Sequence, residues 1–291
     1  MVKNNPMDPE LKQKLMKIAV LFAVLLLAAV WIAWGNTALE LNAYSIRSER
    51  IPEEFYGFRI AHVSDLHNTE IGKGNEKLLN MLRKAQPDLI AITGDLIDSR
   101  NTKLSVALDF VEKAVEIAPC YYVAGNHESR IEGYDALKSG MEAAGVIVLE
   151  NAQAEISVGD ASITLLGMKD PSFPMEWKDG SLEASVLSLL DSMWPEDDSY
   201  KILLSHRPEL FDVYTARGAD LVLSGHAHGG QFRLPLFGGL YAPQQGWFPQ
   251  YDAGLFEKNG TNMIVSRGIG NSLFPFRFNN RPEVVLVQLE P

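Results

Sequence analysis

Cysteine is almost absent from this sequence, and so is any excess of positive charge. The single cysteine, Cys120, excludes an intramolecular disulfide. It precedes Tyr121, Tyr122 and Val123, a context that favours a buried strand thiol over a catalytic nucleophile. The formal net charge of -11 argues against a general nucleic-acid binder, which needs a basic face. A phosphate substrate is not excluded, because bound divalent cations would reverse the local field.

Charged residues are also missing from one long stretch near the N-terminus. No charge occurs from Ile18 to Leu39, and residues 18–33 are nearly all apolar, which is about the length that spans a bilayer. Trp31 and Trp34 lie at the far end, where membrane anchors place aromatic residues. We therefore expect an N-terminal segment at residues 1–17, a transmembrane anchor at 18–39 and one main domain at 40–291.

Two other interpretations of the apolar stretch remain. It can be a buried core helix, or a cleaved signal peptide, although it is long for a signal and Asn36-Thr37-Ala38 is a poor cleavage site. Basic residues are more frequent before the stretch than after it: Lys3, Lys12, Lys14 and Lys17 precede it, and Arg47 and Arg50 follow. For an anchor, the positive-inside rule predicts a cytoplasmic N-terminus and an extracytoplasmic domain at the cell membrane.

The main domain begins with a half-buried strand at residues 39–46, followed by three strand–helix units. The predicted strands are residues 59–64, 88–93 and 121–124, and the predicted helices are residues 75–86, 104–117 and 134–144. The strands are apolar without alternation, as expected when helices or a second sheet cover both faces. Each strand ends in a polar motif, and the carboxyl ends of strands are where open α/β sheets place their sites.

The second half of the domain is more varied. We expect a strand at 146–149, a hairpin at 156–158 and 162–166, helices at 182–193 and 208–216, strands at 200–204 and 221–223, a loop at 235–251, and closing strands at 263–265 and 284–289. No repeat or linker divides the region. It therefore reads as one α/β domain.

Five of the six histidines fall just after predicted strands. The motifs are Asp65-Leu66-His67, Gly94-Asp95, Gly125-Asn126-His127, Ser205-His206 and Gly225-His226-Ala227-His228. Taken singly, each residue could be a structural histidine, a turn former or a helix cap. Their joint occurrence at strand ends predicts a metal site. The sixth histidine, His62, lies inside a strand and is predicted to belong to the core.

The kinds of ligand indicate the chemistry. Two divalent ions roughly 4 Å apart can share a hydroxide that attacks a phosphate ester in line, and an aspartate can bridge them. Mixed imidazole and carboxylate ligands suit Mn, Fe or Zn better than Ca or Mg. Because side chains two apart in an extended segment point the same way, Asp65 and His67 are expected to chelate one ion.

These motifs, with Asp98 and Glu128 beside them, match in order those of the calcineurin-like metallophosphoesterases. Arg59 to His67, Gly229-Gly230-Gln231 and Pro282-Glu283 resemble the bacterial membrane-anchored phosphodiesterase branch of that superfamily. The resemblance implies a four-layer α/β/β/α sandwich and two metal ions, Mn²⁺ favoured and Fe or Zn as alternatives.

The resemblance also implies a role for each residue. Asp65, His67 and His228 would hold one metal, Asn126, His206 and His226 the other, and Asp95 would bridge them. His127 would not bind metal; it would protonate the leaving oxygen or stabilise the transition state, and Asp98 would orient His127. Related protein phosphatases carry an arginine directly after that aspartate, whereas Ser99 stands here and Arg100 comes next. An arginine clamp on the phosphate is therefore not expected.

The expected function is a membrane-anchored phosphoester hydrolase, with a phosphodiesterase favoured. A nuclease or phosphomonoesterase on the same scaffold and a non-catalytic membrane-tethered binding module are the alternatives. The substrate is expected to be a small or lipid-linked phosphoester, including nucleotide-linked ones, rather than nucleic acid, and the protein a monomer. The apolar residues of loop 235–251 can form a rim at the site or pack into the core. A nucleotide-linked acylated sugar would lie on the cytoplasmic face, which conflicts with the predicted orientation.

Overall fold

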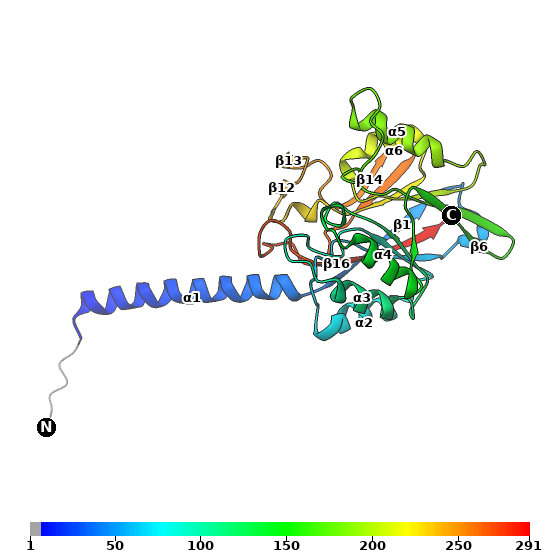
Figure 1. The fold of residues 1–291 in the computed structure, drawn as a ribbon. Coiled ribbons are helices and arrows are strands. Elements are labelled where there is room, and N and C mark those ends of the chain that lie inside the picture. Colours follow the sequence, from blue (N-terminus) through cyan, green and yellow to red (C-terminus); the bar gives the residue numbers. More distant parts are fainter. Residues whose placement is uncertain (1–6) are drawn as a thin grey trace.

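Two six-stranded sheets form the centre of the domain in the computed structural model, which describes residues 7–291 (Figure 1). The first sheet has the order β1-β16-β2-β3-β4-β5. Its strands are β1 (Glu40–Arg47), β16 (Glu283–Glu290), β2 (Arg59–Val63), β3 (Leu89–Thr93), β4 (Cys120–Val123) and β5 (Ile147–Val148). Strands β2 to β5 are parallel, β16 is antiparallel to β2, and β1 is parallel to β16.

The second sheet has the order β14-β15-β9-β8-β7-β6. Its strands are β14 (Gly254–Lys258), β15 (Thr261–Val265), β9 (Leu221–Ser224), β8 (Lys201–Leu204), β7 (Ala161–Gly167) and β6 (Ala152–Val158). Strands β15, β9, β8 and β7 are mutually parallel, whereas β14 and β6 run antiparallel at the two edges.

Helices cover the outer face of each sheet. Three helices pack on the first sheet, namely α2 (Glu76–Ala85), α3 (Leu104–Ala114) and α4 (Tyr134–Ala143), and two pack on the second, α5 (Leu182–Met193) and α6 (Phe211–Arg217). A central apolar cluster joins the inner faces of both sheets, with Ala91 and Val287 on one side and Ile202 and Leu223 on the other. This arrangement confirms the predicted four-layer α/β/β/α sandwich. The interior strands are buried on both faces, which explains their unbroken apolar runs.

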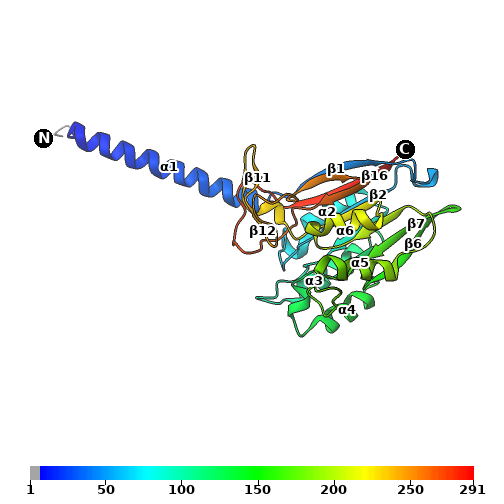
Figure 2. The same ribbon diagram turned by 90° about the horizontal axis from the view of Figure 1, so that it is seen from above.

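A single long helix, α1 (Pro9–Thr37), projects from the domain (Figures 1 and 2). It has 29 residues, none of them buried, and its most apolar window has a mean hydropathy of 2.7, so it is long and apolar enough to cross a membrane. The helix begins before the predicted residue 18 because Asp8 caps it, accepting a hydrogen bond from the Glu10 amide. Lys3, counted above in the charge asymmetry, lies outside the described residues.

The structure adds one strand that was not predicted, β14, and short strands in and just before the loop predicted at residues 235–251. Strand β14 pairs with β15 through a turn at Asn259 and Gly260, both with positive φ. An Asn-Gly pair is a strong hairpin signal, so this hairpin could have been predicted from the sequence. The loop after the last histidines carries two small ribbons, β10 (Arg233–Leu234) with β11 (Gly238–Gly239) and β12 (Tyr241–Ala242) with β13 (Gly246–Trp247).

Candidate metal centre

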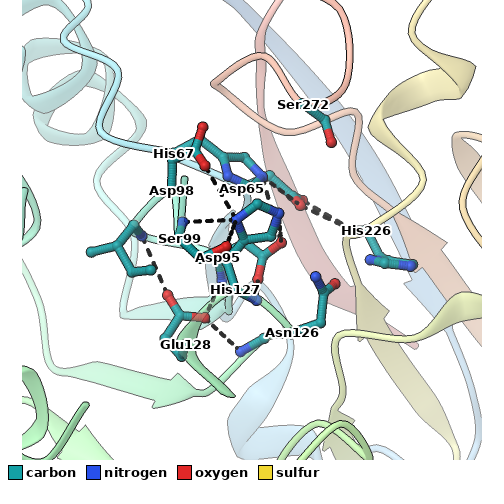
Figure 3. Close-up of polar contacts among 12 residues, drawn as sticks. Asp65, His67, Asp95, Asp98, Ser99, Asn126, His127, Glu128, His226 and Ser272 are labelled. Carbon is teal, nitrogen blue, oxygen red and sulfur yellow. Dashed lines mark hydrogen bonds and ion pairs between the residues drawn. The ribbon is translucent and has the colours of Figure 1, made fainter. Parts of the chain in front are cut away.

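The carboxyl ends of β2, β3 and β4 in one sheet meet those of β8 and β9 in the other. The turns at these ends bring together all the residues predicted to bind metal: Asp65, His67, Asp95, Asn126, His206, His226 and His228. Each is at most 6% exposed, although their side chains are polar. Figure 3 shows several of them converging on one point between the sheets. Burying so many polar groups costs free energy unless partners compensate, which indicates a functional site.

The first group consists of Asp65, His67 and His228. The Nε2 atom of His228 lies 3.2 Å from Asp65 Oδ1 and 3.2 Å from His67 Nε2. Asp65 Oδ1 and His67 Nε2 are 3.7 Å apart. These three atoms therefore face one another closely enough to bind one ion.

The second group consists of Asp95, His206 and His226. His206 Nε2 lies 3.3 Å from Asp95 Oδ2 and 3.1 Å from His226 Nδ1. The same Asp95 oxygen lies 3.5 Å from His67 Nε2 in the first group. One carboxylate oxygen thus contacts both groups, as a bridging ligand would.

The spacing of these atoms fits metal ligands. Atoms bound at about 2.1 Å to one ion lie roughly 3.0 to 3.4 Å apart in octahedral or tetrahedral geometry. Most of the distances within each group fall in or near this range. Asn126 supplies a further sign, because its Oδ1 is buried without a hydrogen-bond partner. Figure 3 places this amide between Asp95 and His226. These residues and the nature of their atoms fit divalent cations.

The backbone at the site is unusual. Five of the predicted ligands have a left-handed conformation, with φ of 54° at Asp65, 46° at His67, 52° at Asp95, 66° at His226 and 49° at His228. Such conformations are uncommon outside glycine and concentrate at functional sites. The expectation that Asp65 and His67 chelate from an extended segment is therefore wrong. They approach each other because both lie in a tight left-handed turn.

Hydrogen bonds fix which atom of each ring faces the centre. His206 Nδ1 donates to the Thr93 carbonyl at 2.7 Å, which leaves Nε2 free as a ligand atom. His226 Nε2 lies 2.5 Å from Gln244 Oε1 and 3.2 Å from Arg207 Nη1, so its outer partners all approach Nε2, and Nδ1 faces His206. Outer partners of this kind orient metal ligands and set their tautomers.

The electrostatic environment keeps both aspartates ionised. Burial alone would raise the pKa of Asp65 and Asp95, but the surrounding histidines, His228 and His206 first, hold both below their usual range. Burial lowers the pKa of His206, yet the charge of Asp95 outweighs it and raises the pKa to about 10. The two carboxylates therefore attract positive charge to the centre, here the proton on His206, which a bound cation would replace.

His127 stands beside the two groups. Its Nε2 is 4.0 Å from Asp95 Oδ2, and it is close enough to His67 and Asp95 to be a potential ligand itself. The Ser99 amide donates to its Nδ1 at 3.0 Å, so in the neutral ring Nε2 carries the proton. Burial lowers the pKa of His127 to about 4, which keeps the ring neutral at pH 7.

The predicted partner of His127, Asp98, is at a longer distance. Asp98 Oδ1 lies 3.5 Å from His127 Nδ1, and the same carboxylate binds Arg100 at 2.9 and 2.7 Å. Burial opposes the shift, but Arg100 lowers the pKa of Asp98 to about 2. Arg100 is thus bound by Asp98, and the expectation about an arginine clamp on the phosphate stays a prediction. The orienting role of Asp98 stays a prediction, and the Ser99 amide is a closer partner that sequence reasoning missed.

Glu128, which stands beside the metal motifs in the sequence, has a structural role that sequence reasoning missed. It is fully buried, and its carboxylate accepts hydrogen bonds from the amides of Asp95 and Gly125 at 2.8 Å and from that of Ile97 at 3.3 Å. Glu128 therefore ties the turn after β3 to the turn after β4. Its only signal in the sequence was its place directly after Asn126-His127.

A buried ion pair supports the second sheet's side of the centre. Arg207 Nε donates to Asp170 Oδ2 at 2.6 Å and Nη2 donates to Oδ1 at 3.0 Å, while Nη1 lies 3.2 Å from His226 Nε2.

Two other predictions from the sequence are confirmed. His62 is buried in β2, 2.7 Å from Thr93 Oγ1, and Cys120 is a buried thiol whose pKa burial raises to about 12.

Comparison with known proteins agrees with this arrangement. Residues 58–230 match the family model described as calcineurin-like phosphoesterase. The chain is 30% identical to the uncharacterized metallophosphoesterase YkuE of Bacillus subtilis, over 87% of this chain and 86% of the relative. It is 29% identical to the phosphodiesterase YaeI of Escherichia coli, over 80% and 82%. The crystal structure of TT1561 of Thermus thermophilus shares the fold, with a TM-score of 0.51 and 14% identity over 73% of this chain and 90% of that chain.

Proposed function

Because the chain belongs to the calcineurin-like phosphoesterase family and is a metal-dependent phosphoester hydrolase, we propose that it is a two-metal phosphodiesterase held at a membrane by α1. The observation that carries the two-metal proposal is the sharing of Asp95 Oδ2 between two ligand groups, 3.5 Å from His67 Nε2 and 3.3 Å from His206 Nε2. A single-metal site would not need one oxygen to serve two sets of histidines.

The proposal assigns a role to each side chain. Asp65, His67 and His228 hold one ion, Asn126, His206 and His226 hold the other, and Asp95 belongs to both. When bound, the two ions supply positive charge on the phosphoryl oxygens and lower the pKa of a shared water. The mixed nitrogen and oxygen ligands favour Mn²⁺, with Fe or Zn as alternatives.

His127 acts as the general acid in this proposal. Its neutral ring presents Nε2–H toward the centre, because the Ser99 amide donates to Nδ1 at 3.0 Å. From that position Nε2–H donates a hydrogen bond to the leaving oxygen as the ester bond breaks, and it transfers its proton once Nδ1 carries a second proton on the side of Asp98 Oδ1, 3.5 Å away, so that the ring ends neutral. Asp98 and the Ser99 amide hold the ring at the correct angle.

The N-terminal helix carries the proposal of membrane attachment. We assign residues 1–17 to an N-terminal segment, 18–39 to the anchor and 40–291 to the hydrolase domain. The exposed surface of α1 is apolar over most of its length, and exposed lysines lie near its N-terminal end. By the positive-inside rule, we expect the domain on the extracytoplasmic side.

The proposed substrate is a small or lipid-linked phosphodiester, nucleotide-linked compounds included.

The test uses the full chain reconstituted in lipid nanodiscs. Hydrolysis of bis-p-nitrophenyl phosphate and p-nitrophenyl phosphate is measured with Mn²⁺, with EDTA as a control, and metal content is measured by elemental analysis. Wild-type protein is expected to bind two ions and cleave the diester faster than the monoester. Asp95→Asn is expected to lose metal and activity together, because the amide cannot bridge two cations.

Other outcomes would change the assignment. Full activity of Asp95→Asn with both ions retained would exclude the bridging role. Preference for the monoester would make the protein a phosphomonoesterase, and faster cleavage of single-stranded DNA or RNA would make it a nuclease. Two bound ions without cleavage of any of these esters would favour a binding module.

A further inference from the structure

An apolar groove lies next to the metal centre. It has a volume of about 300 Å³ and is lined mainly by Phe232, Leu240, Tyr241, Trp247, Leu273 and Phe274. Two of the residues that line it are exposed to solvent, Trp247 at 69% and Phe274 at 44%. Large apolar side chains that are grouped and exposed in this way are unfavourable in water unless a ligand, partner or membrane covers them.

The groove adjoins the metal centre. Leu273 lines both the groove and the metal pocket, which also contains Asp95, His127 and His226. A small hollow shares His228 with the metal pocket, Tyr241 with the groove and Leu273 with both. Arg130 and Gln244 line the metal pocket but not the groove, so the polar contacts lie in the metal pocket and the apolar contacts in the adjoining groove.

The groove lies at the end of the domain from which α1 leaves. Figures 1 and 2 both show the loop with β12 close to the end of α1. The segment that supplies Leu273 and Phe274 is joined to the helix, since the Arg277 amide donates to Asn36 Oδ1 at 2.7 Å and Asn36 Nδ2 donates to the Arg277 carbonyl at 3.0 Å. A membrane that contains α1 would therefore face the groove.

Apolar side chains protrude from the loop that carries the groove. Leu236 is 102% exposed, Phe237 72% and Phe248 57%. The alternative that these residues pack into the domain core is therefore wrong. They suit insertion into a lipid surface, where aromatic and aliphatic side chains are stable.

We propose that the groove binds the hydrocarbon chain of an amphiphilic phosphodiester, taken from the bilayer that holds α1, while its phosphate lies at the metal centre. The inference rests on the proposed phosphodiesterase function and narrows its substrate to a lipid. The polar part of the molecule beyond the phosphate lies toward Arg130, and the chain leaves past Leu273 between Trp247 and Phe274.

The experiment measures how turnover depends on chain length. The full chain in nanodiscs is given p-nitrophenyl alkyl phosphodiesters with methyl, butyl, hexyl and octyl chains, in Mn²⁺. For wild-type protein, kcat/KM should rise up to about fourfold per methylene until the groove is filled, since each methylene that leaves water contributes about that factor. The double variant Trp247→Ser, Phe274→Ser should lose most of this rise.

A matched control separates groove binding from partition into the bilayer. Trp177 is 61% exposed and lines neither the groove nor the metal pocket, so Trp177→Ser should keep the wild-type chain-length dependence. Partition of an ester between water and the bilayer does not depend on which variant is present. An equal rise in the double variant would therefore overturn the proposal. The single variants Trp247→Ser and Phe274→Ser are measured as well. Wild-type metal content in each variant excludes misfolding as the cause of a lost chain-length dependence.

The failures of the two proposals are distinguishable. Cleavage of the methyl ester with no dependence on chain length would leave the phosphodiesterase function intact and overturn the lipid substrate. Faster cleavage of thymidine 5'-p-nitrophenyl phosphate than of the octyl ester, lost in the double variant, would assign the groove to a nucleobase instead. No cleavage of any ester would overturn both.

Discussion

At the scale of single residues, Asn126 and His127 are neighbours in the turn after β4 with different surroundings. Asn126 has a buried oxygen without a partner, whereas His127 has its Nδ1 bound by the Ser99 amide. The first environment suits a metal ligand, because an ion would satisfy the oxygen. The second suits an acid, because the hydrogen bond fixes the proton on Nε2. Adjacent residues in one motif therefore have separable roles.

This difference gives a matched pair of substitutions. Asn126→Ala should lose about one of two ions, because it removes one ligand of one site only. His127→Ala should keep both ions and slow turnover by roughly 10²–10⁴, the usual contribution of a general acid. Metal content by elemental analysis and kcat on bis-p-nitrophenyl phosphate test both. If His127→Ala loses metal, His127 is a ligand, as its distance to Asp95 also permits.

The residue types at the centre could be predicted from the sequence, but their conformations could not. Asp65, His67 and Asp95 were identified by their place after apolar strands. Nothing in their identity indicates a left-handed backbone, which L-residues adopt only when surrounding contacts compensate the strain. Glu128 was underestimated for a related reason, since two of its partners are backbone amides that lie 33 and 31 positions away in the sequence.

At the scale of elements, the turn after β9 must approach the turn after β2 very closely. A Cβ atom at Gly225 would lie 1.9 Å from Ser64 Oγ and 2.4 Å from Asp65 Oδ2. The His226 amide, next in the chain, donates to Asp65 Oδ2 at 3.1 Å. Glycine at this position therefore allows one sheet's edge to contact the other, so that ligands from both can reach one centre.

Gly225→Ala should consequently separate the two edges. We expect a loss of metal affinity and a destabilisation of about 1–3 kcal/mol or more, because the methyl group overlaps buried atoms. Metal content, turnover and denaturant unfolding measure the effect. Gly133→Ala is the matched control, since its Cβ would meet only Leu104 Cδ1 at 3.6 Å. Wild-type metal content in Gly225→Ala would show that the close approach is not required.

At the scale of the whole molecule, the layer order was expected from the family resemblance, whereas the strand order was not predicted. The strand–helix units that lead to β2, β3 and β4 are local, so apolar runs and polar ends identify them. The position of β16 between β1 and β2 is not local, because it pairs residues from opposite ends of the domain, such as Leu41 with Val284. Only tertiary packing selects that pairing, and no periodicity in the sequence specifies it.

The pairing of β1 with β16 determines where the domain can be separated from its helix. Residues Glu40 to Arg47 pair with Glu283 to Glu290, and Ile46 is 1% exposed in the central cluster. Glu40 also forms ion pairs with Arg267 and Arg281. A soluble domain must therefore retain all of β1, although this strand follows the apolar helix almost directly.

Two truncations test this boundary. A chain that begins at Ala38 keeps β1 and should remain folded, leave the membrane fraction and retain turnover of small esters. A chain that begins at Ser48 loses β1, exposes the edge of β16 and removes Ile46, whose burial alone is worth about 2–5 kcal/mol. It should aggregate or unfold at a clearly lower Tm, because an exposed apolar edge strand also promotes association. Thermal unfolding and fractionation by centrifugation compare the pair directly. Equal Tm values would mean that β1 is an accessory strand and that the hydrolase domain begins after it.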